Sequence, residues 1–358
     1  MVSTRPVPLY RRDSKMHRNL LTQCVFPMRT IMKRIAMLGI VFLLATSAAL
    51  AQQRGRRGQR EGRQAGVAAA GATTEPAIKP THADVVYVTR SSQDLKLDAY
   101  LADSDKPTPA MVYIHGGGWR GGGKALGTRF PMFLLEQGRK AGISIFSIQY
   151  RLTGVEPHPA QRLDCERAIQ FIRYKAKEWN IDPERIGVMG NSAGAHLSLL
   201  IGLRDDQADP KSSDPVQRQS TRVSCIVNCS GCVDLRLFGQ MLVDHPSFRM
   251  YLDVEPGTRP DDIPDELIAD ASPLTFATKD DPPVLTLHGA EDTLVSPEQA
   301  KLLDARLKEL GVPSTLTMLD GVGHGIFPAM TAERKQDAME FIKRHLLAPL
   351  PKEEGGTS

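Results

Sequence analysis

The pentapeptide Gly-Asn-Ser-Ala-Gly at residues 190–194 constrains the fold of this 358-residue chain more than any other feature of its sequence. It follows an apolar run at residues 185–189 and precedes a helix-like stretch at residues 195–201. A sharp turn from strand to helix forces the middle residue, Ser192, into a strained conformation, and the small flanking residues relieve the crowding. The pattern therefore predicts a nucleophilic serine at a helix N-terminus, and a serine that only caps the helix is the alternative.

A second motif, His-Gly-Gly-Gly-Trp at residues 115–119, follows another short apolar run at residues 110–114. Glycines let the backbone approach a substrate closely and present free N–H groups to it. Acyl transfer needs such donors, because the carbonyl oxygen becomes an oxyanion in the transition state. A phosphate-binding loop would require Ser or Thr after Gly-Lys, whereas Ala125 follows Lys124 here. Together the two motifs predict a serine hydrolase.

The general base and its acidic partner are sought among residues that follow strand-like runs. His324, one of nine histidines, lies among three glycines after the apolar run at residues 315–319 and before the last helix-like stretch. Asp292 follows the run at residues 284–288 and is the best candidate to orient the imidazole, with Glu291 and Asp320 as the other candidates. The order Ser192, Asp292, His324 is typical of α/β-hydrolases and differs from that of chymotrypsin or subtilisin.

With these motifs the chain resembles α/β-hydrolase esterases that carry an H-G-G-G-W oxyanion motif, akin to hormone-sensitive-lipase-like carboxylesterases. It is similar to the small bacterial esterases that include feruloyl and acetylxylan esterases, over residues 84–347. The resemblance implies that the N–H groups of Gly117, Gly118 and Ala193 form the oxyanion hole. Asn191 departs from the acidic residue or glycine common in the family, which bears on substrate preference and not on the chemistry.

The order of apolar runs predicts an α/β-hydrolase fold with about eight strands in a mostly parallel sheet, helices on both faces and a small cap or insert. Strands are expected at residues 85–88, 95–100, 111–115, 143–150, 186–191, 225–229, 284–288 and 314–319. Helices are expected at residues 129–141, 159–179, 193–203, 297–310 and 331–347.

Two segments, residues 205–222 and 234–280, interrupt this alternation, and we expect both to lie above the carboxyl edge of the sheet and to shape the pocket. Bulky side chains of the second segment would wall an acyl pocket that favours short acyl chains. These side chains are Phe238, Met241, Leu242, Phe248, Met250 and Tyr251.

Residues 1–51 have the features of a secretory signal peptide, with the true start at Met28 or Met32. An uncharged apolar core at residues 35–45 follows basic residues, and Ala-Leu-Ala at residues 49–51 matches the cleavage pattern. The expected location is therefore periplasmic or secreted, without stable membrane insertion after cleavage. Arg54, Arg56 and Arg57 directly after this core leave an N-terminal membrane anchor as the alternative.

The amino-acid composition divides residues 52–358 into a linker, a catalytic domain and a tail. Residues 52–80 are Gly, Arg, Gln and Ala with little to bury, which predicts a disordered linker before a catalytic domain at residues 81–350 and a tail at residues 351–358. Residues 1–80 hold 14 Lys and Arg and 3 Asp and Glu, so the net charge of +4 comes from the leader and linker. The predicted catalytic domain is mildly acidic, which argues against a nucleic-acid partner.

The cysteines and histidines give no metal site, because a single Cys-x-x-Cys has no partner pair. Cys165, Cys225, Cys229 and Cys232 remain after signal cleavage, and buried free thiols are the favoured state. Pairing of Cys229 with Cys232, or of Cys232 with Cys165, stays open, whereas Cys225 and Cys229 are about 13 Å apart on one strand, too far to bridge.

The function predicted from these observations is a serine carboxylesterase that cleaves short-chain acyl or polysaccharide-linked esters through Ser192, His324 and Asp292, with no metal or organic cofactor. An amidase, formamidase or peptidase could use the same residues. A third possibility, an inactive α/β-hydrolase used for binding, is disfavoured because the nucleophile and the base are both present. The oligomeric state is not predicted.

Overall fold

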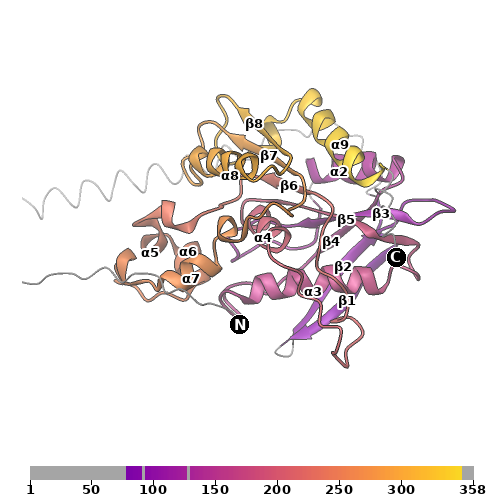
Figure 1. The fold of residues 1–358 in the computed structure, drawn as a ribbon, viewed down its shortest axis with the longest axis horizontal. Coiled ribbons are helices and arrows are strands. Elements are labelled where there is room, and N and C mark those ends of the chain that lie inside the picture. The colour runs from indigo at the N-terminus through magenta and orange to yellow at the C-terminus, as the bar shows by residue number, and fades with distance from the viewer. Residues whose placement is uncertain (1–77, 91–92, 127–129, 349–358) are drawn as a thin grey trace, which may run out of the picture. The chain divides into compact units, whose positions relative to one another are not determined.

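Eight strands form one mixed sheet in the order β1-β2-β4-β3-β5-β6-β7-β8 in the computed structural model, which describes residues 78–90, 93–126 and 130–348 (Figure 1). The first two pairings, β1 with β2 and β2 with β4, are antiparallel, and the others are parallel. The α/β-hydrolase architecture predicted from the sequence is confirmed. The strands are β1 His82–Arg90, β2 Gln93–Tyr100, β3 Thr108–Ile114, β4 Ser144–Ile148, β5 Ile181–Asn191, β6 Ile226–Cys229, β7 Val284–Gly289 and β8 Ser314–Leu319.

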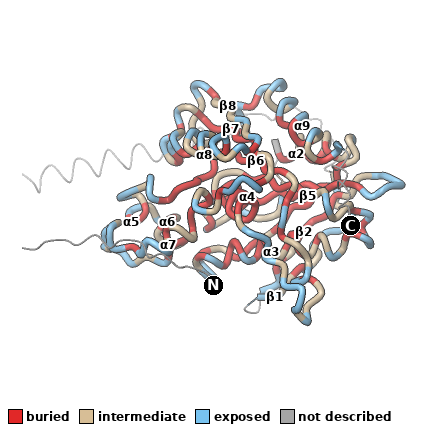
Figure 2. Tube along the Cα trace, in the orientation of Figure 1, coloured by how far each residue is buried: buried red, intermediate tan, exposed pale blue. Residues whose placement is uncertain are grey.

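Helices cover both faces of the sheet because the central strands bury side chains on both sides. Along β3, Val112 and Ile114 pack into one core cluster, whereas Met111 and Tyr113 pack into the other. The first cluster lies under α3 Ala160–Tyr174, α4 Ala193–Gly202 and α8 Pro297–Glu309. The second lies under α2 Phe130–Lys140 and α9 Ala332–Leu346. Figure 2 shows the buried stretches running through the central strands between these layers.

Helix α3 and strand β5 differ most from the bounds predicted from the sequence, whereas the other predicted elements differ by at most three residues at either end. Helix α3 ends at Tyr174 and not at residue 179, because residues 175–180 form turns that place Trp179 against Phe146, with ring centroids 5.5 Å apart. Strand β5 begins at Ile181, which pairs with Thr108, and not at residue 186. The aromatic packing of Trp179 ends the helix although the residues around it are helix formers.

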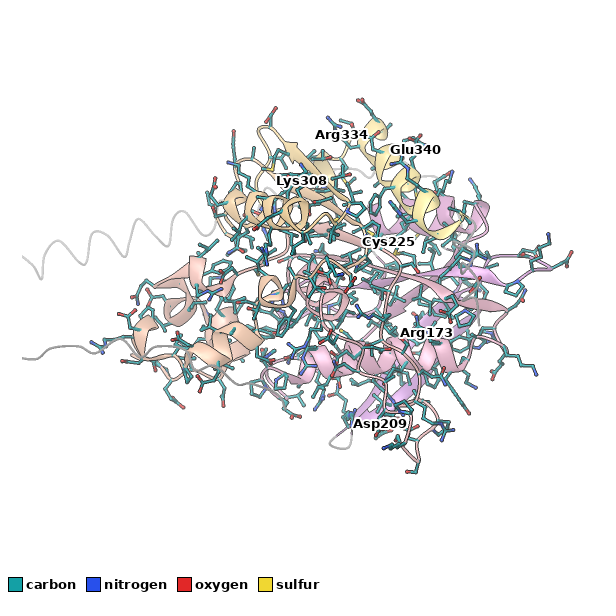
Figure 3. All side chains as sticks on the ribbon, viewed as in Figure 1. Arg173, Asp209, Cys225, Lys308, Arg334 and Glu340 are labelled. Atoms are coloured by element: carbon teal, nitrogen blue, oxygen red, sulfur yellow. The ribbon has the colours of Figure 1, made fainter. Side chains whose placement is uncertain are left out.

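The prediction that residues 205–222 shape the pocket is wrong. Helix α4 runs back from the carboxyl edge of the sheet, so the segment that follows it lies near the start of β5. Arg173 of α3 holds this region in place, donating from Nε to Pro183 O at 2.9 Å and from Nη2 to Arg222 O at 2.8 Å. In Figure 3, Arg173 and Asp209 lie near α3 and far from the helices α5–α7.

The segment at residues 234–280 does cover the carboxyl edge, as predicted. It contains helices α5 Met241–Asp244, α6 Pro246–Leu252 and α7 Asp265–Asp270, and short 3-10 turns at Leu235–Phe238, Pro260–Asp262 and Pro273–Phe276. Residues 234–280 are called the insert below. A further 3-10 turn, Phe327–Ala329, follows β8. In Figure 1 the helices of the insert stand together at one end of the sheet.

The four cysteines of the described region, Cys165, Cys225, Cys229 and Cys232, are buried free thiols. Neither of the two pairings that the sequence left open is formed. Burial raises the pKa of the Cys225 thiol to about 12, and burial likewise raises the pKa of Cys232 to about 12. These thiols therefore stay protonated and unreactive at neutral pH.

Within the described residues, we find no helix with both the length and the apolar character needed to cross a membrane. The predicted signal peptide, nearly all of the predicted linker and the tail lie outside the described residues.

Candidate active site

Ser192 lies at the sharp turn between β5 and α4, with φ 51° and ψ −122°. Its N–H donates to Cys229 O at the end of β6, at 2.8 Å, and its carbonyl accepts from His196 N of α4 at 2.9 Å. These two hydrogen bonds fix the conformation of Ser192. Only glycine fits two residues before and two residues after Ser192. A Cβ at Gly190 would lie 2.2 Å from the Gly194 carbonyl carbon, and one at Gly194 would lie 2.1 Å from Ile114 O. The turn places the Ser192 hydroxyl in a cavity at the carboxyl edge of the sheet.

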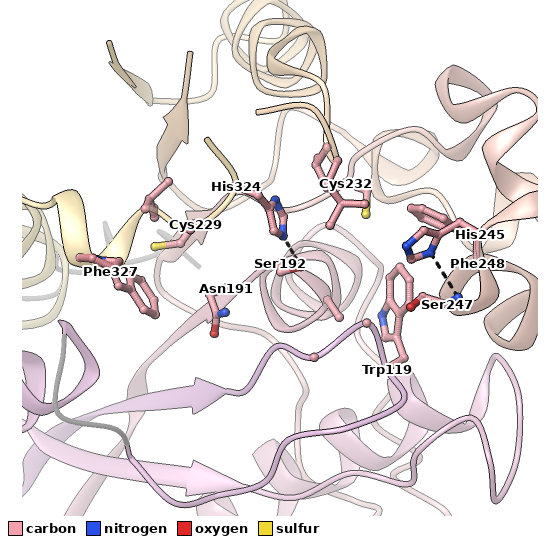
Figure 4. A pocket seen from close by; sticks show the side chains of 18 residues that line it. Trp119, Asn191, Ser192, Cys229, Cys232, His245, Ser247, Phe248, His324 and Phe327 are labelled. Atoms are coloured by element: carbon pink, nitrogen blue, oxygen red, sulfur yellow. Dashed lines mark hydrogen bonds between the residues drawn. The ribbon is translucent and has the colours of Figure 1, made fainter. Parts of the chain in front are cut away.

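The structure brings Ser192, His324 and Asp292 together from three separate loops. The distance between His324 Nε2 and Ser192 Oγ is 2.8 Å (Figure 4). The distance between His324 Nδ1 and Asp292 Oδ2 is also 2.8 Å. Because the carboxylate accepts the Nδ1 proton, Nε2 is free to accept the serine proton. Each residue follows a parallel strand, and parallel strands end at the same edge of a sheet.

Asp292 is fixed by hydrogen bonds from His324 and from two backbone N–H groups, and by a contact with His288. Its Oδ1 accepts from the N–H groups of Leu294 and Val295, both at 2.9 Å. Its Oδ2 lies 3.3 Å from Nε2 of the fully buried His288, which also donates to Val295 O at 2.8 Å. Burial alone would raise the pKa of Asp292, but the hydrogen bonds from His288, His324 and the Val295 N–H outweigh it and hold the pKa well below its usual range. The carboxylate is therefore ionised at neutral pH.

The other acidic candidates do not reach the imidazole. Glu291 and Asp320 are both exposed, and neither carboxylate contacts His324 in the described structure. The contact between His288 and Asp292 was missed by sequence reasoning, which took His288 only as the end of a strand. The spacing His-Gly-x-x-Asp at residues 288–292 is the signal that could have revealed it.

The glycine segment after β3 has the backbone conformation of a close-approach loop. Gly117 has φ 113° and Gly118 has φ 60°, values that residues other than glycine rarely adopt. Gly117, Gly118 and Ala193 all line the cavity that contains Ser192. The three residues expected to donate to the oxyanion therefore share one cavity with the Ser192 hydroxyl.

Asn191 connects this glycine segment to the nucleophile turn. Its Oδ1 accepts from Tyr113 Oη at 2.8 Å and from Gly116 N at 3.2 Å. The side chain fits so closely that a Cβ at Gly116 would lie 2.6 Å from Asn191 Nδ2. An amide oxygen at this position therefore sets the spacing between the oxyanion segment and Ser192, a role that the sequence did not reveal.

The cavity above Ser192 has a volume of about 360 Å³, within the usual range for small-molecule sites. Of the bulky insert residues expected to wall it, only Phe248 does so; Phe238, Met241, Leu242, Met250 and Tyr251 are not among its lining residues. Tyr251, three residues after Phe248 and on the same side of α6, is fully buried and packs against Trp119 instead of lining the cavity. His245 and Ser247, which the sequence analysis did not propose as lining residues, line the cavity instead.

The BD-FAE family model matches residues 97–307, more than half of the chain and most of the folded region. The chain belongs to the BD-FAE family. Within this family match lie the glycine segment, the nucleophile turn and Asp292, whereas His324 follows it.

Among curated proteins the chain is similar to esterase LipC of Mycobacterium tuberculosis, with 29% identity over 221 residues, which is 62% of this chain and 53% of the relative. The chain spans about half the length of the curated relatives it matches. The resemblance to esterases predicted from the motifs is confirmed.

Two solved structures are similar to this chain over nearly their whole length. An acetyl ester-xyloside bifunctional hydrolase from Caldicellulosiruptor lactoaceticus has 28% identity and a TM-score of 0.64, and the match covers 75% of this chain and 98% of the other. A carbohydrate esterase from gut microbiota has 26% identity and a TM-score of 0.60, with 75% and 96% covered. The fold of this BD-FAE chain is therefore that of carboxylesterase-type α/β-hydrolases.

Trp119 anchors the glycine segment of this BD-FAE protein. It has a positive φ of 58° and is held by a stack on Tyr251, with ring centroids 4.3 Å apart and planes at 20°. Tyr251 Oη donates to His158 Nδ1 at 2.8 Å, and His158 Nε2 donates to Asp270 Oδ2 at 2.7 Å. These polar contacts tie the insert to the loop before α3 and hold Tyr251 against the strained segment.

His196, one turn after Ser192, packs in the interior, as its position in the sequence indicated. Its Nε2 donates to Ala271 O at 2.8 Å, and its ring meets the edge of Trp119 at a centroid distance of 5.2 Å. Burial lowers the pKa of His196 to about 3, so it is neutral at physiological pH. It helps to fix the insert against α4 and lies outside the lining of the cavity.

Proposed function

We propose that this protein is a serine carboxylesterase that cleaves short-chain acyl esters, including those carried on carbohydrates. The observation that supports this most directly is the contact series from Ser192 through His324 to Asp292, with both distances at 2.8 Å, beside a glycine segment of positive φ. The similarity to esterases, and the carbohydrate esterases among the solved structures, agree with this proposal.

In the proposed reaction Ser192 Oγ attacks the ester carbonyl carbon while His324 Nε2 takes the hydroxyl proton. The carbonyl oxygen becomes an oxyanion, which the N–H groups of Gly117, Gly118 and Ala193 stabilise. The tetrahedral intermediate collapses, the C–O bond breaks, and the alcohol leaves with the proton from His324. Water then attacks the acyl-enzyme, with His324 again as base, and releases the acid and Ser192. Asp292 stays ionised and stabilises the imidazolium in both steps.

Acyl chain length gives the first test of the proposal. Phe248 and Phe327 are among the bulky side chains that line the cavity of about 360 Å³, and adding methylenes to a filled pocket costs about 1–3 kcal/mol. We expect kcat/KM for p-nitrophenyl esters to be highest from acetate to butyrate and to fall at least about tenfold by octanoate. A rate that rises steadily to C8 or beyond, or that jumps above the substrate's micelle concentration, would contradict a small pocket.

Amide hydrolysis is the second candidate, because the same three residues could attack an amide carbonyl. The matched pair of p-nitrophenyl acetate and p-nitroacetanilide separates the two reactions. We expect the ester to be hydrolysed at least about 10³-fold faster, since the phenolate leaves without the full protonation that an anilide requires. A purely binding protein would hydrolyse neither substrate.

We also propose that the protein is exported to the periplasm or secreted. The basis is the sequence alone, namely the apolar core at residues 35–45 and Ala-Leu-Ala at residues 49–51. We expect the protein recovered from its host to begin at or near Gln52 and to fractionate outside the cytoplasm. N-terminal sequencing of each cell fraction makes the measurement, and a full-length chain in the inner membrane would support an uncleaved anchor instead.

A further inference from the structure

The cavity has two sides of different chemistry around Ser192 and His324. Figure 4 shows Cys229 and Phe327 on one side of this pair, and Trp119, Phe248, His245 and Ser247 on the other. The first side is mainly apolar and continues into Ile326 and Pro328. Its one labelled amide, Asn191, already accepts hydrogen bonds through Oδ1 from Tyr113 and Gly116. The second side carries an imidazole and a hydroxyl in addition to its aromatic rings.

His245 presents a hydrogen-bond donor to this second side. It precedes α6, and its Nδ1 accepts the N–H of Ser247 at 3.3 Å, which places the ring proton on Nε2. The ring is held edge-on to Phe248, with centroids 5.8 Å apart. Within the described residues Nε2 has no hydrogen-bond partner, and the side chain is only half-buried. The N–H group is therefore oriented and available to a ligand.

Ser247 presents a second polar group, next to the oxyanion segment. A Cβ built on Gly118 would lie 2.5 Å from Ser247 Oγ, so the hydroxyl is packed directly against that glycine. In the part of the chain that the structure describes, Oγ makes no hydrogen bond. The absence of a side chain at Gly118 thus makes room for a free hydroxyl in the cavity.

We propose that His245 and Ser247 form a subsite for the alcohol part of the substrate and that this alcohol is a sugar or a similar polyol. The inference rests on the proposed esterase function and goes beyond it by naming the residues that choose the leaving group. A short acyl chain has no polar group to satisfy an imidazole N–H and a hydroxyl, and polar groups left unpaired in a closed complex cost free energy. A polyol supplies acceptors and donors on neighbouring carbons.

Two acetates of similar shape test this subsite, namely methyl β-D-xylopyranoside monoacetate and cyclohexyl acetate, which has no hydroxyl groups. We expect Ser247→Ala and His245→Leu each to lower kcat/KM for the xyloside about tenfold, the value of one hydrogen bond, mainly through KM. For cyclohexyl acetate we expect each variant to stay within about threefold of the unmodified protein. Arg249→Gln, on the same helix and outside the cavity lining, controls for disturbance of α6 and should change neither rate.

The outcomes separate this inference from the proposed function. Equal losses on both acetates, seen in kcat, would overturn the subsite and would instead make Ser247 a further donor to the oxyanion. Equal rates of the unmodified protein on both acetates, insensitive to either substitution, would overturn it as well while leaving the esterase proposal intact. Failure of the unmodified protein to hydrolyse either acetate or p-nitrophenyl acetate would reject the proposed function itself.

Discussion

Ser192→Ala should lower kcat for p-nitrophenyl acetate by about 10⁴-fold or more, while the fold remains intact. In the proposed reaction the Ser192 hydroxyl forms the acyl-enzyme. Among the described residues it is the serine hydroxyl that lies within hydrogen-bond distance of His324, at 2.8 Å. Alanine fits the position sterically, because it removes only Oγ. Steady-state kinetics measures the loss, and circular dichroism with thermal unfolding checks that the variant is folded.

A matched control comes from Ser198, on helix α4, which directly follows Ser192. Its hydroxyl donates to Gly194 O at 2.9 Å in the interior and does not line the cavity. We expect Ser198→Ala to retain activity within a few-fold and to affect stability by about 1 kcal/mol, the usual cost of one buried hydrogen bond. Phosphonate labelling followed by mass spectrometry should place the adduct on Ser192, and an adduct on any other serine would refute the assignment.

Asp292→Asn should lower kcat by about 10⁴-fold, nearly as much as loss of the nucleophile. The carboxylate of Asp292 accepts the Nδ1 proton of His324 at 2.8 Å, which leaves Nε2 unprotonated toward Ser192. An amide can donate to Nδ1 instead, so the imidazole would carry its proton on Nε2 and could not accept one from serine. Glu291→Gln and Asp320→Asn are the controls, and since both carboxylates are exposed, we expect each to stay within about twofold of the unmodified enzyme.

The same substitution has a defined effect on stability against pH. Because the pKa of Asp292 is held below its unfolded value, its ionised form stabilises the fold above about pH 4, and that contribution is lost as pH falls through the folded-state pKa. Asp292→Asn should therefore lower the free energy of unfolding at pH 7, and the gap to the unmodified protein should narrow from pH 4 downward. Urea unfolding at several pH values measures this, and a gap independent of pH would show that the carboxylate is not selectively stabilised.

Local sequence patterns determined the elements and the order of the functional residues. The β–α alternation, the pentapeptide at residues 190–194 and the glycines at residues 116–118 act over a few residues, through side-chain periodicity and steric demands on φ. Because parallel strands end at one edge, the positions of Ser192, Asp292 and His324 after separate strands were enough to predict that the three would meet.

Only the tertiary structure decided which other side chains reach the cavity. The bridge from Asn191 to Tyr113 and the approach of Ser247 to Gly118 each join segments whose relative placement depends on packing. The insert residue Tyr251 is apolar enough to have been expected in the pocket wall, yet it stacks beneath Trp119. Long-range contacts, such as that of Tyr251 with His158, decide which side of a short helix faces a cavity. The local periodicity of the sequence does not encode such contacts.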